Sequence, residues 1–117
     1  MTPQDFVLAL KTQAAKAAAS EVDYYKNLPS KNPPEHLKRF AQWFDRLAES
    51  DKETAADLIR YAKEGEVFSL LTYIDNLSFL SGERGRFELF HVDNDGNRTL
   101  LNEPEGDLLT DIFNNEG

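Results

Sequence analysis

The segment RFELFHVDNDGNRTLL, residues 86–101, decides the fold class of this chain. Its first half is rich in aromatic and β-branched residues, which is typical of a β-strand. The sequence DNDGN at 93–97 follows, and Asn, Asp and Gly tolerate the positive φ angles of a hairpin turn. Residues 98–101 then predict the returning strand. The segment therefore predicts an antiparallel β-hairpin.

Alternation along the first strand gives the predicted hairpin two different faces, because successive side chains point to opposite sides. If Phe87 and Leu89 face the core, Phe90 points away from it. An apolar ring among carboxylates suits a basic, partly apolar partner, and aromatic residues dominate interface hot spots. The candidate protein-binding residues are Phe90, Glu88, Val92, Trp43, Asp93 and Asp95.

Upstream of the hairpin, apolar residues recur every three or four positions and predict a bundle of about four helices. In the second helix, Phe40 lies in the apolar stripe and Trp43 at its edge. We expect Gly65 to end the third helix, as a C-terminal glycine usually does. The four helices are predicted at residues 3–27, 32–49, 50–65 and 66–75.

The remaining elements are a short strand at 79–81 and a last helix that opens at Pro104 or Glu105. Helices followed by a small antiparallel sheet define an α+β fold. The length of 117 residues suits one domain. We therefore predict a single α+β domain over 1–117, with a helical part at 1–76 and a hairpin plus terminal helix at 77–117.

Composition excludes several classes of protein. The chain has no cysteine, so disulfides and thiolate zinc sites are excluded. No apolar run approaches the roughly 18 residues of a membrane span. The N-terminal sequence MTPQD has an acid where a signal peptide has bases. We expect a cytoplasmic protein that does not contact membranes.

Charge is concentrated in the last third of the chain. The whole sequence has 21 acidic and 13 basic residues, a net charge of −8, and residues 83–117 hold nine acids against three bases. This balance argues against nucleic acid, whose phosphates require a basic face. It favours a basic protein partner that is attracted by the acidic C-terminal third.

No motif predicts a metal, a cofactor or a reaction. When DNDGN is aligned with a calcium loop, His91 occupies the position of the first Asp ligand and Asn102 that of the bidentate Glu. His36 and His91 have no paired spacing for zinc. No serine lies in a G-x-S-x-G setting. We expect no metal, no cofactor and no enzyme activity, although the many carboxylates leave a small carboxylate-based enzyme or metal-binding domain as an alternative.

The predicted function is non-enzymatic binding of another protein, as an inhibitor or adaptor. In size, acidity and lack of catalytic motifs the chain is similar to bacterial toxin-immunity proteins, which block a basic toxin by charge and shape. No residue motif carries this similarity, so it transfers no site residue. The alternative is a structural homodimer, paired through an exposed strand edge or through the alanine-rich face of the first helix.

Overall fold

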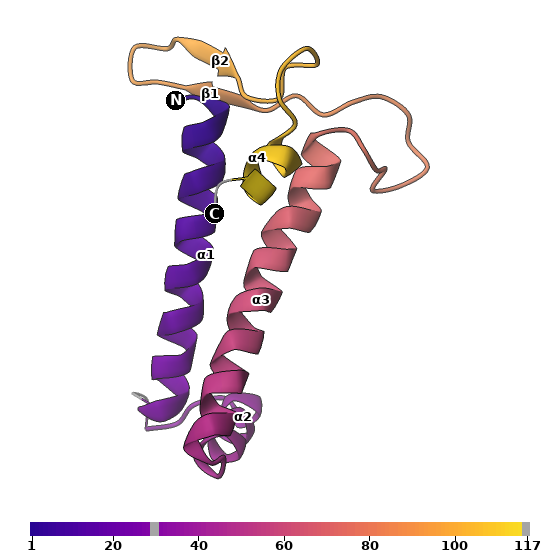
Figure 1. Cartoon of the computed structure of the whole chain (residues 1–117). Helices are drawn as coiled ribbons and strands as arrows, with labels where there is room; N and C mark the ends of the chain where they lie inside the picture. Colours follow the sequence, from indigo (N-terminus) through magenta and orange to yellow (C-terminus); the bar gives the residue numbers. More distant parts are fainter. Residues whose placement is uncertain (29–30, 116–117) are drawn as a thin grey trace. The chain divides into compact units, whose positions relative to one another are not determined.

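The computed structural model of the protein describes residues 1–28 and 31–115 and confirms the α+β class (Figure 1). The described residues form four helices and one two-stranded antiparallel sheet. In chain order these elements are α1 (Pro3–Lys26), α2 (Glu35–Asp45), α3 (Glu49–Ile74), β1 (Phe90–Val92), β2 (Arg98–Leu100) and α4 (Leu109–Asn115). No described helix is long and apolar enough to cross a membrane.

The chain divides into two compact units, and the boundary runs through both long helices. The first unit contains Met1–Thr12 and Gly65–Gly117, and the second contains Gln13–Glu64. Each unit therefore takes part of its core from α1 and part from α3.

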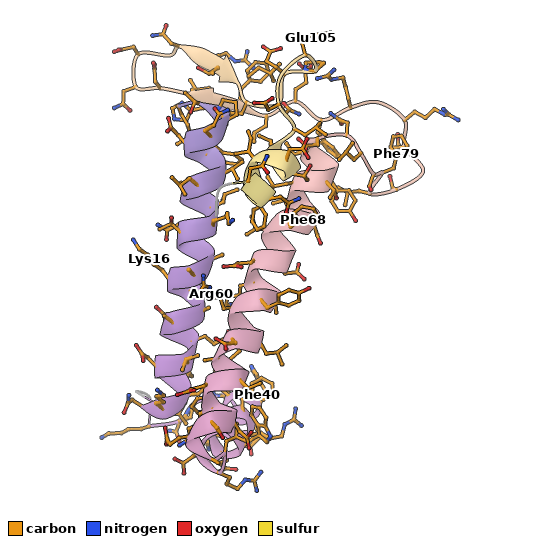
Figure 2. The ribbon with its side chains drawn as sticks, in the orientation of Figure 1. Lys16, Phe40, Arg60, Phe68, Phe79 and Glu105 are labelled. Carbon is orange, nitrogen blue, oxygen red and sulfur yellow. The ribbon has the colours of Figure 1, made fainter. Side chains whose placement is uncertain are left out.

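The core of the first unit joins the start of α1, the end of α3 and the short α4. Val7, Leu71 and Leu109 have no exposed surface and lie at its centre. Phe113 of α4 packs edge-on against Phe68 of α3, with 5.6 Å between ring centroids (Figure 2). These contacts bury the apolar side of α4, which at seven residues is too short to be stable alone.

The second unit has its own core between the end of α1, α2 and the start of α3. Phe44 of α2 is almost fully buried and belongs to one cluster with Val22 and Ala55. The ring of Tyr25 lies against this cluster, and its hydroxyl donates a 2.8 Å hydrogen bond to Glu21. The amphipathic pattern of α2 thus places its apolar side in a core.

The hairpin has the predicted turn at its tip. Phe90 pairs with Leu100, and Val92 pairs with Arg98. The Oδ1 atom of Asp93 accepts hydrogen bonds from the N–H groups of Asp95 and Asn97, both at 2.9 Å. These bonds close an Asx-type turn that fixes the end of β1.

Side-chain amides hold the C-terminal segment against the end of α3. The buried amide of Asn102 donates to the carbonyl oxygens of Ile74 (2.6 Å) and Phe87 (2.9 Å) and accepts from the N–H of Leu89 (2.9 Å). Asn76, which has a φ of 62°, accepts a 2.7 Å bond from the N–H of Phe87. The hairpin is therefore attached to α3 through two asparagines.

Several predicted boundaries are wrong. Gly65 does not end a helix, because α3 continues through it to Ile74. Residues 79–81 form no strand, and the last helix begins at Leu109 instead of Pro104 or Glu105. The first strand is confined to β1, because residues 87 and 89 bond to asparagine side chains at positions where a longer strand was predicted.

Candidate interaction surfaces

The outer face of the hairpin exposes the residues that alternation places there. Phe90 is 37% exposed and Val92 55% exposed, whereas His91 on the opposite face is half-buried. The guanidinium of Arg98 lies over the Phe90 ring, 4.1 Å from its centroid. Stacking of this kind leaves the charge in water and one face of the ring covered.

Phe87 does not follow the alternation. The interpretation of the hairpin took a core position for Phe87 as its condition, but Phe87 is 49% exposed. Its N–H and carbonyl groups bond to Asn76 and Asn102, so it lies outside the strand. Because the strict two-residue period applies only within a strand, the prediction for Phe87 is wrong.

Carboxylates flank Phe90 and Val92 along the chain, while Arg98 covers one face of the Phe90 ring. Glu88, Asp93 and Asp95 are exposed and, with Phe90 and Val92, form what we call the acidic hairpin surface. Four more exposed acids follow in the same unit, and Figure 2 labels one of them in the loop before α4. They are Glu103, Glu105, Asp107 and Asp111. None of the seven carboxylates forms a salt bridge with any residue in the described part of the chain.

The turn keeps one of these carboxylates charged. The N–H of Asn97, and then that of Asp95, lower the pKa of Asp93 because both donate hydrogen bonds to its carboxylate. Asp93 therefore holds a fixed negative charge at the tip of the hairpin, in a side chain that the turn already orients.

Trp43 belongs to the other unit, so the structure does not group it with the other five candidates. It is 50% exposed on α2, and Phe40, which was expected in the core stripe, is 38% exposed. Residues three or four positions away from Phe40 and Trp43 lie on the same side of α2 as these two rings. The exposed set, which we call the basic aromatic face, is His36, Arg39, Phe40, Trp43 and Arg46.

The basic aromatic face was missed by sequence reasoning, although its signal is readable. The guanidinium of Arg39 lies 5.5 Å from the centroid of the Phe40 ring, and the His36 ring packs edge-on at 5.9 Å. One carboxylate borders this face, because Glu35 lies four residues before Arg39, and it pairs with Lys38. Neither Arg39 nor Arg46 forms a salt bridge within residues 1–28 and 31–115. Two unpaired arginines beside exposed rings are an unusual feature in a chain with net charge −8.

Two shallow hollows lie elsewhere. One, of about 340 Å³, lies in the second unit along the alanine-rich side of α1 and is lined by Ala15, Ala18, Ala19, Val22, Asp23, Ala56, Asp57 and Arg60. The other, of about 170 Å³, lies in the loop after α3 around Phe79, which Figure 2 labels, and it includes Arg84 and Phe87. The first hollow borders the alanine-rich face that the sequence suggested for self-association, although Ala14 and Ala18 of that face are buried.

Neither metal ligands nor known relatives assign a function. Within the two described ranges, no three His, Asp or Glu side chains are grouped closely enough to hold a metal ion. No protein-family model, curated protein or solved structure matches the chain. The surfaces described above are therefore the basis for a functional proposal.

Proposed function

We propose that this protein acts in the cytoplasm by binding another protein through the acidic hairpin surface, and that it catalyses no reaction. The partner is a basic, partly apolar protein and not a nucleic acid. The observation that carries the proposal is the exposed pair Phe90 and Val92 beside carboxylates that form no salt bridge with any described residue. Exposed apolar side chains rimmed by charge are characteristic of interaction sites.

Charge and ring have separate roles in this proposal. The carboxylates attract a basic surface over a distance and so increase the association rate, an effect that salt screens. The ring of Phe90 then supplies apolar area that is buried in the complex and slows dissociation. The Asx-type turn at Asp93 is already formed, so little conformational entropy is lost on binding.

The test is affinity capture from the source cell's lysate with the wild-type chain and three variants. Phe90→Ala removes the ring and keeps the charge, whereas Glu88→Gln keeps the ring and removes one charge. Leu58→Ala is the matched control, because Leu58 is an exposed apolar residue of the second unit. We expect a basic protein that both hairpin variants retain less well and the control retains fully. Equal recovery with all four chains would rule out the hairpin as the binding surface.

The hollow on α1 favours a second candidate function, a homodimer through the alanine-rich face. Small side chains allow close approach of another helix, and the hollow can receive side chains from it. Ala19, which is exposed at its edge, can be replaced with Arg to block this approach. Light scattering of the wild-type chain and Ala19→Arg at two concentrations separates this candidate from the first.

A further inference from the structure

We propose that the basic aromatic face of α2 binds the acidic hairpin surface of a second copy of this chain. The inference rests on the proposed function, since it names a partner for the same acidic surface. It differs from the homodimer through the alanine-rich face, because two unlike surfaces meet.

The basic aromatic face has the composition of an interface. It carries Trp43, Phe40 and two arginines, and Trp, Phe and Arg are enriched in protein interfaces. The opposite side of α2 is already occupied, since Ala41 and Phe44 are buried in the core of the second unit. On the outward side Trp43 is half exposed, whereas Phe40 borders the core, packs edge-on against Tyr25 with 6.2 Å between ring centroids, and keeps 38% of its surface exposed.

The charges of α2 are arranged so that this face stays positive. Glu35, four residues before Arg39, borders this face and pairs with Lys38 at 3.9 Å, whereas Asp45 lies off the face by the helical period. Arg39 and Arg46 are left without a carboxylate in the described chain. A guanidinium binds a carboxylate with two parallel hydrogen bonds, so each arginine can bind one acid of a partner.

The acidic hairpin surface offers the complementary groups. It has three exposed carboxylates in Glu88, Asp93 and Asp95, and the ring of Phe90, of which Arg98 covers one face and leaves the other free. Arginines on one surface meet carboxylates on the other, and Trp43 or Phe40 meets Phe90 as an aromatic pair. Both surfaces occur on every copy, so a second copy satisfies the charge complementarity without any other molecule.

A contact between two unlike surfaces has a consequence for assembly. A copy that binds through its hairpin still has a free α2 face, and a copy that binds through its α2 face still has a free hairpin. Further copies can therefore add until the contacts close into a ring. A basic partner that occupies the acidic hairpin surface competes with this association. The proposed function and self-association are thus mutually exclusive at one hairpin.

Two variants that each lack one surface test the inference. Arg39→Glu with Arg46→Glu reverses the charge of the basic aromatic face. Glu88→Lys with Phe90→Ala reverses one charge and removes the ring of the acidic hairpin surface, while leaving the Asx-type turn at Asp93 intact. The wild-type chain should form a closed dimer or larger species as concentration rises at low salt, and high salt should return it to monomer. Each variant alone should remain monomeric, and an equimolar mixture should form 1:1 dimers, because one intact surface of each kind remains. Sedimentation velocity measures all four samples.

Controls separate this inference from the alternatives. Circular dichroism and thermal melting establish that both variants fold, and every substituted residue is exposed. A wild-type chain that stays monomeric at high concentration and low salt overturns the inference, while the capture experiment above can still succeed with a basic partner. A second outcome also overturns the inference. If Ala19→Arg abolishes association and Arg39→Glu with Arg46→Glu leaves it intact, the contact between copies is formed by the alanine-rich face.

Discussion

The carboxylate of Asp75 binds Thr110 twice. Its Oδ2 atom accepts hydrogen bonds from the backbone N–H and from the hydroxyl of Thr110, both at 2.9 Å, and its Oδ1 atom accepts from the N–H of Leu109 at 2.8 Å. The first N–H groups of a helix have no partner within the helix and are usually capped by the preceding residue. Here a residue 35 positions earlier in the chain performs that role for α4.

Replacing Asp75 with Ala should therefore destabilise the first unit. Three hydrogen bonds are lost and two backbone N–H groups at the start of α4 lose their acceptor, so we expect a fall of about 1–3 kcal/mol in the free energy of unfolding. Urea denaturation followed by circular dichroism measures it. Glu53→Ala is the control, because it removes an exposed acid from α3 that caps nothing. Equal stabilities of the two variants would contradict the capping role.

Asn102 should tolerate neither an apolar nor an acidic substitute. Its amide nitrogen donates to two carbonyl oxygens, so Asn102→Asp places a carboxylate against them with no proton to share. We expect a loss of about 2 kcal/mol or more, and a smaller loss for Asn102→Ala. Asn114→Asp adds the same charge at an exposed position of α4 and serves as the control. Thermal melting compares the three variants, and an Asn102→Asp chain as stable as the control chain would exclude this account.

Gly65→Ala should stabilise the protein. Gly65 lies inside α3 and is exposed, and a Cβ atom there meets nothing within 4 Å. Alanine favours a helix interior over glycine by about 1 kcal/mol, so the midpoint of thermal unfolding should rise. Gly85→Ala is the opposite case, since its φ of 126° is unfavourable for a side chain and the midpoint should fall. A lower midpoint for Gly65→Ala would mean that α3 needs glycine at this point.

Stability should decline at high pH through Tyr25. Burial and then the hydrogen bond to Glu21 raise its pKa from 10.0 to about 12. As pH rises, the unfolded chain therefore loses the phenol proton before the folded chain does. The contribution of Tyr25 to the free energy of unfolding is fully present below about pH 10 and is lost as pH approaches about 12. Denaturation at several pH values should show a smaller decline for Tyr25→Phe than for the wild-type chain. The control is Tyr61→Phe, which removes an exposed phenol of α3, and a decline that Tyr25→Phe leaves unchanged would refute the assignment.

Local sequence signals predicted the elements that depend on neighbouring residues. The hairpin follows from the turn at 93–97 and from alternation, and both operate over a few residues. The start of α4 could not be predicted in this way, because its cap is Asp75 and nothing near Leu109 reports it. Gly65 was misinterpreted for a similar reason. The cost of one glycine, about 1 kcal/mol, is small beside the packing of the following turns of α3 around Leu71.

For the candidate binding residues too, the sequence predicted what depends on near neighbours in the chain and missed what depends on distant ones. Exposure of Phe90 follows from the alternation within β1, whereas exposure of Phe87 depends on bonds to Asn76 and Asn102 that no local pattern encodes. Trp43 was singled out as a lone aromatic at the edge of a stripe. Phe40 was placed in the apolar stripe, because periodicity alone cannot tell which aromatic of a wide stripe the core accepts.

The polar bonds at the end of α3 also determine where the chain can vary in length. The backbone is held by side-chain hydrogen bonds in two places. Residues 87–89 bond to Asn76 and Asn102, and residues 109–110 bond to Asp75. The stretches 77–86 and 103–108 lie between these points and form local bonds, such as that from the N–H of Gly106 to the carbonyl of Glu103. Because longer loops cost little closure entropy, peptide tags or reporter sequences inserted in either stretch should leave the hairpin and α4 in register.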